Sequence, residues 1–371
     1  MLAHVKRQEM LTLAYQAAKA VPRTAGAQAD AIKGIHMEAD SRRSMITLTA
    51  TNYEVAIRTS MAASVEESGS CVVSASLFPE VIAKLPEEDV DLETGESSRL
   101  TIRSGNSCFH LDVLPGDRYP MPELPFPDDT LPVSGLCFLA RNTVFAAAED
   151  GSQSPPLKCI QLHIGPEGLK ASASNGFCVM EADGDKTCRG HSELLLPAHS
   201  LKVLASISRD SDVYEMGLAG KSLVFWSGTL LFSARLVEGR FPEVGKLLAQ
   251  FKGQYSVHLD AEELRHAIEA VAAVAEQNAR IELAFGEHEI TLSAESAYGR
   301  SSAPVKALVL SAPATPFYYN YKKLLEYLSL AKGKITLEFD PSGLLAIRPG
   351  STRYLQSPMR PPTKAASGKA A

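Results

Sequence analysis

The sequence predicts an α+β fold made of three tandem repeats, each with two helices packed on antiparallel strands. One landmark is a short run of small or polar residues that leads into an apolar helix. It recurs after 124 and 123 residues, at Leu77, Leu201 and Leu324. A second landmark is a glycine between two strand-like runs, which recurs after 123 and 122 residues, at Gly105, Gly228 and Gly350. Two independent landmarks with one period indicate homologous domains of ordinary size.

The landmarks place domain boundaries at 1–130, 131–250 and 251–361, followed by a tail at 362–371. The tail, "PTKAASGKAA", is poor in apolar residues, so we expect it to be disordered.

The elements of each repeat follow in one order. A first helix is expected at 7–21, 139–150 and 260–276, the last with Asp260 as its N-cap. Alternating strands follow, for example at 44–60 and 281–296. The second helix begins near each leucine landmark, and a closing hairpin turns at each glycine, where positive φ is needed.

The stretch "SARLVEGRFPEVGKLL" (233–248) holds a strand-like run, a Glu-Gly turn, an Arg-Phe-Pro and a short amphipathic segment. Its place in the repeat makes it the last strand of the middle unit, continuing into the linker to the third. A proline at 242 fixes φ and turns the chain there.

Composition is that of a globular protein: 371 residues, 45% hydrophobic and 22% charged. No apolar run reaches 18 residues, and the first helix carries charges where a signal peptide needs an apolar core. Six scattered cysteines are expected to be reduced and structural, as in the cytoplasm. The net charge of −6 argues against coating nucleic acid with the whole surface but allows a local basic face.

Catalytic motifs are not found. "GLAGKS" (217–222) ends like a phosphate-binding loop, but Glu215 stands where the first glycine is required. No GxSxG, HExxH or Cys/His metal spacing occurs. The acidic segment 85–96 fits a solvated turn better than a cation site. We therefore expect no catalytic residue, metal or cofactor, with an enzyme of unrecognised site as the alternative class.

Four segments together resemble the bacterial sliding clamp, the beta subunit of DNA polymerase III. They are "TATNYEVAIRT" (49–59), "RSGNSCFHLDVLPGDRYPMPE" (103–123), "ARLVEGRFPEVGKLL" (234–248) and "SPMRP" (357–361). The resemblance covers residues 1 to about 361. It implies a head-to-tail homodimer that closes a six-domain ring around double-stranded DNA, lined by helices, with sheets that continue across domain and subunit borders.

The resemblance also implies a function: a non-catalytic processivity factor of the bacterial cytoplasm and nucleoid. It would tether the replicative polymerase, the clamp loader and other proteins that carry a clamp-binding motif. Such a ring must hold DNA without sequence preference and without tight phosphate contacts, which would stop sliding.

Helix-borne cations are the candidates for facing DNA, although each fits a solvated helix face equally well. They are Arg7, Arg23, Lys84, Arg141, Lys202, Arg265 and Lys322, with Lys6, Lys19 and Lys323 as further candidates. Arg23 matches the family position best. The family's basic pair in the middle domain is replaced by Ala198 and His199, which predicts a weaker hold on DNA.

The family docks partner peptides in a cleft between its second and third domains. The matching positions here are Leu157, Ser174, Gly176, Val179, Pro242, Lys246, Leu247, Asn320, Leu355, Pro358, Met359 and Arg360. Apolar side chains from several segments suit an aromatic or leucine anchor, and methionine adapts to different partners. Without the resemblance, Pro242 would be taken simply to end a strand at a linker.

The chain departs from the family within this cleft. Residues 174–179 read Ser-Asn-Gly-Phe-Cys-Val instead of a Thr-Asp-Gly-His-Arg-Leu type, Ser154 replaces an arginine, and Pro361 replaces a terminal leucine. The tail after Pro361 could partly cover the cleft, although an inert extension is favoured. A divergent paralogue with specialised partners is therefore the alternative to a standard clamp.

The resemblance implies a subunit interface as well. An edge strand with Phe109 and Leu111 would pair with the third domain of the other chain, where Ala273 and Val274 would receive the aromatic ring. These partners are small, which predicts a looser dimer.

Overall fold

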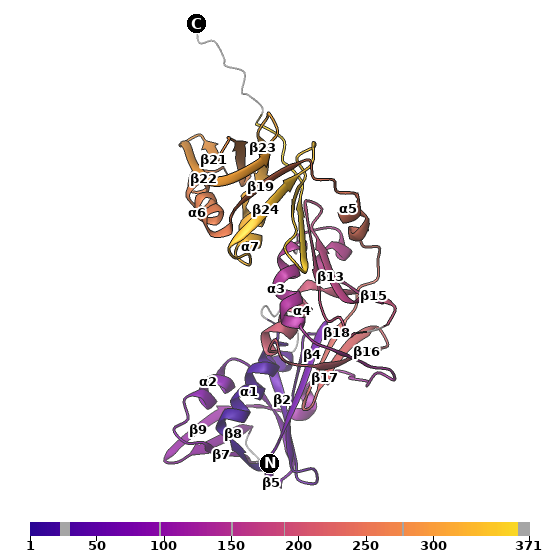
Figure 1. Ribbon diagram of the computed structural model, residues 1–371. Coiled ribbons are helices and arrows are strands. Elements are labelled where there is room, and N and C mark those ends of the chain that lie inside the picture. The colour runs from indigo at the N-terminus through magenta and orange to yellow at the C-terminus, as the bar shows by residue number, and fades with distance from the viewer. Residues whose placement is uncertain (23–29, 96–97, 150, 189, 277, 363–371) are drawn as a thin grey trace. The chain divides into compact units, whose positions relative to one another are not determined.

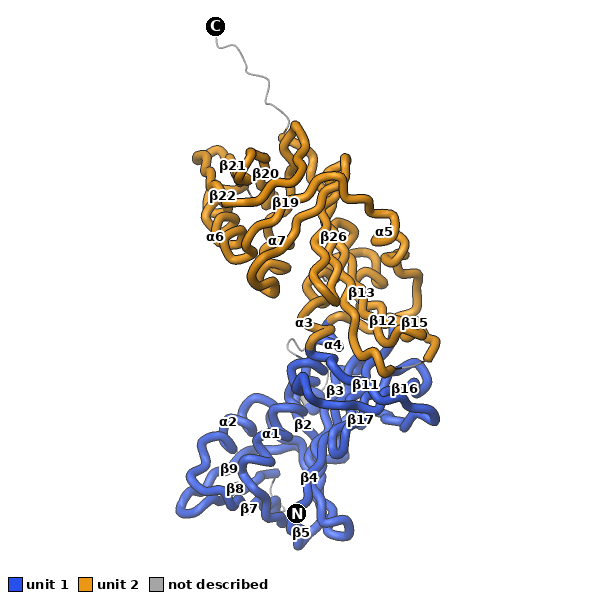
Figure 2. The backbone as a smooth tube through the Cα atoms, viewed as in Figure 1, with its two compact units in different colours: residues 1–137, 199–236 blue, residues 138–198, 237–371 orange. Residues whose placement is uncertain are grey.

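The computed structural model describes residues 1–22, 30–95, 98–149, 151–188, 190–276 and 278–362 (Figure 1). The chain forms two compact units: residues 1–137 with 199–236, and residues 138–198 with 237–371 (Figure 2). The border between the units runs through the stretch 131–250, so these units do not coincide with the three predicted domains. The three-domain division remains a prediction.

Unit 1 contains a five-stranded antiparallel sheet with the order β5-β1-β7-β8-β9. The strands are β5 (Ser64–Glu67), β1 (Leu2–Lys6), β7 (Asp89–Thr94), β8 (Arg99–Ser104) and β9 (Ser107–Asp112). β9 is therefore an edge strand.

A nine-stranded sheet makes up the rest of unit 1, in the order β10-β6-β2-β3-β4-β18-β17-β16-β11. Its strands are β10 (Leu114–Pro115), β6 (Gly69–Ser74), β2 (Gly34–Asp40), β3 (Met45–Thr51), β4 (Val55–Ala62), β18 (Leu230–Arg235), β17 (Ser222–Ser227), β16 (Tyr214–Ala219) and β11 (Leu131–Val133). β4 pairs with β18, with Ile57 opposite Phe232. The sheet thus continues from the first predicted repeat into the middle one.

The helices of unit 1 cover these strands. α1 (Arg7–Ala18) packs against α2 (Leu77–Ala83) and against β3 and β4, burying Met10, Leu13, Ala14 and Ala17. The short 3-10 turns η1 (Asp30–Lys33) and η2 (Gly116–Arg118) precede β2 and follow β10. α4 (Ala198–Ile207) starts at the border between the units.

Unit 2 is organised by one twelve-stranded sheet with the order β15-β12-β13-β14-β26-β25-β24-β19-β22-β21-β20-β23. The strands are β15 (Ser192–Pro197), β12 (Cys159–Gly165), β13 (Gly168–Ser174), β14 (Cys178–Asp183), β26 (Thr352–Gln356), β25 (Leu345–Ile347), β24 (Lys334–Phe339), β19 (Tyr255–Asp260), β22 (Gly299–Ser311), β21 (Glu289–Ser296), β20 (Arg280–Phe285) and β23 (Phe317–Asn320). β14 pairs with β26, with Val179 opposite Leu355, which joins the middle repeat to the third.

The helices of unit 2 are α3 (Leu136–Thr143), which begins at the unit border, α5 (Val244–Gln250), α6 (Ala261–Ala272) and α7 (Tyr321–Leu328), with 3-10 turns η3 (Val144–Ala146) and η4 (Pro155–Lys158). Asp260 caps α6 as predicted, because its carboxylate accepts hydrogen bonds from the backbone N–H of Glu262 (2.9 Å) and Glu263 (3.2 Å).

The helix predicted at 139–150 is wrong in its bounds. α3 begins three residues earlier and ends at Thr143, before a 3-10 turn. The side chains of its last residues compete for helix carbonyls: Asn142 donates to Phe138 O at 2.8 Å, and Thr143 donates to Leu139 O at 2.7 Å. Such side-chain bonds weaken the continuation of a helix.

The three landmark glycines behave as predicted. Gly105, Gly228 and Gly350 have φ of 55°, 56° and 58°, and turn the β8–β9, β17–β18 and β25–β26 hairpins. Left-handed turns that recur after 123 and 122 residues agree with the predicted repeat at the level of the backbone.

Five of the six cysteines are buried. Burial raises the pKa of the Cys71 thiol to about 12. Cys108, on β9, is exposed and so departs from the expectation of a structural cysteine. Within the described ranges, no helix is long and apolar enough to cross a membrane, and no cluster of His, Cys, Asp and Glu side chains could hold a metal ion.

Two glycine substitutions should shift stability in opposite directions. Gly228→Ala forces a side chain into positive φ at a site with open space, so we expect the free energy of unfolding to fall by about 1 kcal/mol. Gly245→Ala lies in α5, also with open space but without positive φ, and should raise that energy by about 0.5 kcal/mol. Urea denaturation followed by circular dichroism compares them; equal effects would contradict the role of backbone conformation at Gly228.

Candidate functional site

The segment after β18 crosses one face of the twelve-stranded sheet as a linker. Val237 N–H donates to Leu195 O at 3.0 Å, which fastens the linker to β15. After the turn at Pro242, whose carbonyl accepts from Val244 N–H at 2.8 Å, the chain enters α5. Phe241 and Val244 point into the protein, with exposed fractions of 7% and 2%. The linker is therefore fixed by two buried apolar side chains.

A buried apolar cluster lies under the linker. Its members come from the linker and from strands on both sides of the β14–β26 pairing: Cys159, Val179, Leu195, Phe241, Val244, Phe251, Ala346 and Leu355. Val179 and Leu355, both predicted to wall the cleft, belong to this cluster and expose little surface. Their side chains pack beneath the linker, against Phe241 and Val244 of the same cluster.

A pocket of about 550 Å³ opens beside the linker. It brings together four of the predicted residues, Leu157, Pro242, Lys246 and Leu247, with five others: Ser154, Arg240, Phe241, Glu243 and Gln250. Leu247 on α5 is exposed, and Leu157 on η4 is half-buried. The pocket thus offers apolar side chains within a polar rim, as ligand-binding pockets commonly do.

The rim carries charges of both signs. Lys246 Nζ lies 2.5 Å from a Glu243 carboxylate oxygen, and this hydrogen bond lowers the pKa of Glu243. Arg240 is exposed on the same rim. Because Glu243 neutralises part of the local positive charge, the rim favours neither sign strongly.

A second pocket, of about 600 Å³, shares the Gly239–Lys246 wall and extends over the polar face of the sheet. Its other lining residues alternate along four strands: Gln161, His163, Lys170, Ser172, Glu181, Glu193 and Leu195. Sequence reasoning missed this pocket, although the period-2 polar positions of β12 to β15 were a signal for an uncovered sheet face.

The loop between β13 and β14 carries the predicted Ser174 and Gly176. Asn175 Oδ1 accepts from the backbone N–H of Phe177 and of Cys178, both at 2.9 Å. Ser174 Oγ donates to Cys178 O at 3.0 Å and accepts from Gly176 N–H at 3.2 Å. Gly176 has φ of 88°, which its lack of a side chain permits. Burial raises the pKa of the Cys178 thiol to about 12, so the thiol stays protonated.

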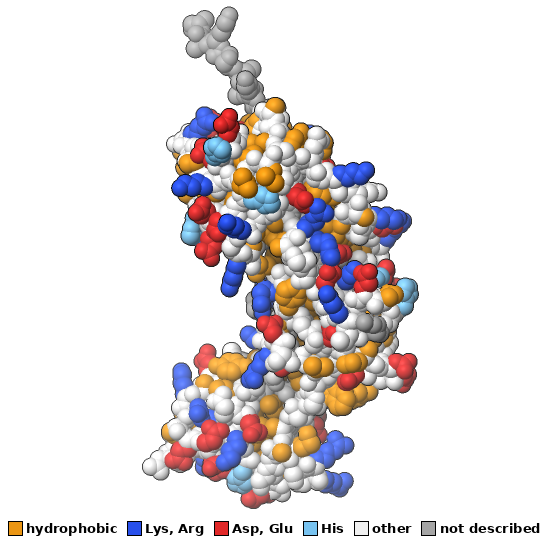
Figure 3. Space-filling view, viewed as in Figure 1, with side chains coloured by type: hydrophobic (Ala, Val, Ile, Leu, Met, Phe, Trp, Pro, Cys, Tyr) orange, Lys and Arg blue, Asp and Glu red, His pale blue; other side chains and the backbone are white. Residues whose placement is uncertain are grey.

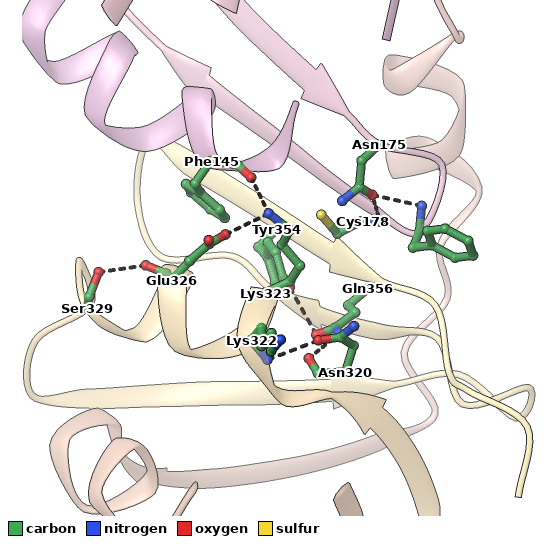
Figure 4. Close-up of polar contacts among 11 residues, drawn as sticks. Phe145, Asn175, Cys178, Asn320, Lys322, Lys323, Glu326, Ser329, Tyr354 and Gln356 are labelled. Atoms are coloured by element: carbon green, nitrogen blue, oxygen red, sulfur yellow. Dashed lines mark hydrogen bonds and ion pairs between the residues drawn. The ribbon is translucent and has the colours of Figure 1, made fainter. Parts of the chain in front are cut away.

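The segment after β26 carries the predicted Pro358, Met359 and Arg360 and is bonded to this loop at Ser357. Ser357 N–H donates to Phe177 O at 2.9 Å, and Met359 N–H donates to Tyr318 O at 2.7 Å. Gln356 Nε2 donates to Asn320 O at 2.8 Å and accepts, through Oε1, from the Tyr354 hydroxyl (Figure 4). Pro358 and Met359 are half-buried, and Arg360 is exposed.

The cations predicted to face DNA all lie on or next to helices, apart from Arg23, which is outside the described residues. Lys84, Arg141, Lys202 and Lys322 are exposed. Arg7 Nε lies 3.6 Å from Glu88, and Arg265 pairs with Glu269 at 3.0 Å. Both signs of charge are interspersed on the visible face (Figure 3).

Lys323, a further candidate, has a different environment. Its Nζ donates to Phe145 O and to Glu326, both at 3.0 Å, and its side chain is 17% exposed (Figure 4). It therefore ties α7 to the turn after α3. Its spacing on the helix could not reveal this, because the partner carbonyl is distant in sequence.

Of the four residues predicted for the subunit interface, two lie on an open sheet edge and two at the end of a helix. Phe109 and Leu111 are on the edge strand β9, half-buried and buried respectively. Ala273 is the exposed C-cap of α6, and Val274 follows it. Among the described strands, the part of β22 from 299 to 306 pairs only with β21 and leaves its other edge open.

Comparisons with known proteins agree along the chain. The family model "DNA polymerase III beta subunit, N-terminal domain" matches residues 1–125. The beta sliding clamp of Streptomyces coelicolor is 26% identical over 97% of this chain and 99% of its own length. That of Halalkalibacterium halodurans is 27% identical over 62% of this chain and 64% of its own length.

Solved structures share the fold. The DNA polymerase III beta subunit of Streptococcus pyogenes superposes with a TM-score of 0.87 at 21% identity, covering 97% of this chain and all of that one. The DNA polymerase sliding clamp of Bacillus subtilis gives a TM-score of 0.85 at 21% identity, covering 97% of this chain and 99% of that one. The predicted α+β architecture is thereby confirmed.

Asn175→Ala should loosen the loop between β13 and β14, because two backbone N–H groups lose their acceptor. We expect a cost of about 1 to 2 kcal/mol in local opening, seen as roughly tenfold faster hydrogen exchange of the Phe177 and Cys178 amides. Asn52→Ala, which removes the matching bonds to Glu54 and Val55, is the control and should leave those amides unchanged. Unchanged exchange in Asn175→Ala would show that the loop is held by other contacts.

Proposed function

The chain belongs to the beta sliding clamp family as a divergent member, and from this premise we propose that it is a DNA sliding clamp, the non-catalytic processivity subunit of a DNA polymerase III holoenzyme. The observation that carries the proposal is the match to the Streptomyces coelicolor clamp over nearly the full length of both chains. The continuous sheets support it, because a closed ring needs rigid joins between successive repeats.

The proposed working form is a homodimeric ring around double-stranded DNA, in the bacterial cytoplasm at the nucleoid. Exposed cations on the helices, such as Lys84, Lys202 and Lys322, would attract phosphates without fixing them. The acidic net charge keeps the rest of the surface from binding nucleic acid. Holding DNA by enclosure leaves the protein free to slide.

Partner proteins, the replicative polymerase and the clamp loader among them, would dock a short peptide in the pocket beside the linker. Leu157, Pro242 and Leu247 provide apolar walls for an aromatic or leucine anchor, and Phe241 supports them from the buried cluster. Met359 lies half-buried in the segment after β26, two residues beyond Ser357, which bonds to the 174–178 loop, and its flexible side chain would adapt to different partners.

A divergent paralogue with specialised partners is the second candidate. The observation that favours it is the altered loop, in which an exposed Phe177 and a buried Cys178 stand where the family usually has charged or polar residues. Both candidates share the ring and differ in the peptides they accept.

A labelled peptide of the Q-x-x-L-F type should bind this protein with a micromolar dissociation constant, measured by fluorescence polarisation. Met359→Ala should weaken binding about five- to tenfold, because an adaptable apolar contact is lost. Lys202→Ala, on a helix of the other unit, is the matched control and should bind as the unaltered protein does. If the full chain does not bind the peptide, the chain lacking residues 362–371 is tested. Absence of binding by both chains would exclude the standard clamp specificity.

Phe109→Ala should shift the dimer towards monomer. Removing a half-buried ring from an open edge strand should cost on the order of 2 kcal/mol, or about thirtyfold in the dimer dissociation constant. Sedimentation at low micromolar concentration measures the mass. His110→Ala, exposed on the same strand, serves as the control, and an unchanged mass for Phe109→Ala would count against this interface.

A further inference from the structure

We propose that an exposed aromatic pair on unit 1, Phe126 and Trp226, forms with the carboxylates around it a docking surface for an arginine-containing segment of a partner protein. Both rings belong to unit 1, whereas the pocket beside the linker belongs to unit 2, so this surface is separate from the proposed peptide-docking site. Phe126 is 59% exposed and Trp226 is 40% exposed. Large aromatic side chains that meet on a surface are typical of interaction sites.

The sheet presents Trp226 on its outward side. The neighbouring Phe225 on β17 is fully buried, and because side chains alternate along a strand, Trp226 points to the opposite face. The indole Nε1–H donates to Gly228 O at 2.9 Å, which satisfies the polar group of the ring and restrains its orientation. The ring of Phe126 meets it in a T-shaped arrangement, with centroids 5.6 Å apart and an interplanar angle of 84°.

The segment between β10 and β11 holds Phe126 in place from both sides. Before it, Leu124 packs against a buried apolar cluster formed by Ala219, Val224 and Leu231. After it, the chain lies directly on Gly217, where an added Cβ would stand 2.6 Å from Pro127 Cβ and 2.4 Å from Asp129 O. Prolines at 120, 122, 125 and 127 restrict the backbone between these contacts. The pair is therefore ordered before a partner arrives, which lowers the entropy cost of binding.

The charge around the pair is negative. Glu215 stands directly opposite Trp226 in the β16–β17 pairing. The segment 119–135 carries Glu123, Asp128 and Asp129, all exposed, and contains no lysine or arginine. Within the part of the chain that the structure describes, none of these four carboxylates has an ion-pair partner. An apolar partner would leave them without a counter-charge, and an acidic partner would be repelled, so the charge favours a cation.

Arginine is the side chain that suits this combination. Its planar guanidinium stacks on aromatic rings and donates in a fork to carboxylates, whereas lysine offers a compact and strongly hydrated charge. The first cation in the strand row through Trp226 is the chain's own Arg58, which follows Leu231 two strands away. At the usual strand spacing this is roughly 10 Å from Trp226, which leaves the Glu215 side of the ring to an arginine of the partner.

Trp226 is the only tryptophan of the chain, so its fluorescence reports on this surface directly. The full chain is titrated with three peptides that have glycine and serine flanks around an Arg-Leu-Arg, a Lys-Leu-Lys or a Gln-Leu-Gln core. With the arginine peptide we expect a saturable change in emission at low salt, with a dissociation constant of about 0.1 to 1 mM. The lysine peptide should bind about threefold more weakly, and the glutamine peptide about tenfold or more weakly.

Two variants test the rings and the carboxylates separately, and both keep the reporting tryptophan. Phe126→Ala should weaken binding of the arginine peptide about fivefold. Glu215→Gln combined with Asp128→Asn should weaken it about tenfold. The matched control is Glu287→Gln combined with Glu289→Gln, which removes two exposed carboxylates from unit 2 and should leave binding within about twofold. Circular dichroism checks that each variant is folded.

Equal binding of the arginine and glutamine peptides, or unchanged binding by the carboxylate double variant, would overturn recognition of a cation here. No saturable change in emission with the arginine peptide would overturn the docking surface itself. An emission change that follows protein concentration without any peptide would assign the pair to a contact between two copies of this chain, and would overturn it as well. Each of these results leaves the binding of Q-x-x-L-F peptides, and thus the proposed function, unaffected.

Discussion

The antiparallel pairing of β14 with β26 is the join on which the candidate site depends. It places Val179 opposite Leu355 and so creates one continuous apolar surface from two repeats. Phe241 and Val244 of the linker are buried on that surface. With the linker fixed, Pro242 and Leu247 are held beside Leu157, and the pocket has a wall.

Polar interactions reinforce the same join. Arg353 on β26 reaches Asp183 with two nitrogens at 3.0 Å and Glu181 at 2.9 Å, both on β14. This fork-like geometry is stronger and more directional than a simple ion pair. On the other side, Tyr354 stacks on Tyr327 with ring centroids 4.7 Å apart, which packs α7 on β26. A rigid join suits a protein whose proposed work is to hold a ring closed while partners exchange on its surface.

The turns after β3 and β13 share their backbone-bonding side chains and differ in the exposed residue. The turn after β13 has an Asn and a hydroxyl residue, as the 51–55 turn does, and both side chains bond backbone groups of the turn. The exposed residue of that turn is not constrained by the fold, as Glu54 and Phe177 show in the two repeats. Partner choice can therefore change without a change in architecture, which is how one fold comes to serve different partners.

The sequence by itself determined the repeat, the α+β class and the caps and turns, since these follow from local periodicity and from single residues. Asp260 as an N-cap and the glycines with positive φ are examples. It also led to Leu157, Pro242, Lys246 and Leu247, through the family resemblance, and the structure places these four around one pocket. Where α3 ends was not predicted, because side chains of its last turn compete for the carbonyls.

Only the tertiary structure decided which of the named residues are surface and which are support. Val179 and Leu355 look the same in sequence as Leu247, yet the strand pairing buries the first two and leaves the third exposed. Lys323 has the pattern of a solvated cation, but its ammonium group donates a hydrogen bond to a carbonyl in a distant turn. Burial and long-range hydrogen bonds depend on contacts between segments far apart in the chain, and no local pattern records them.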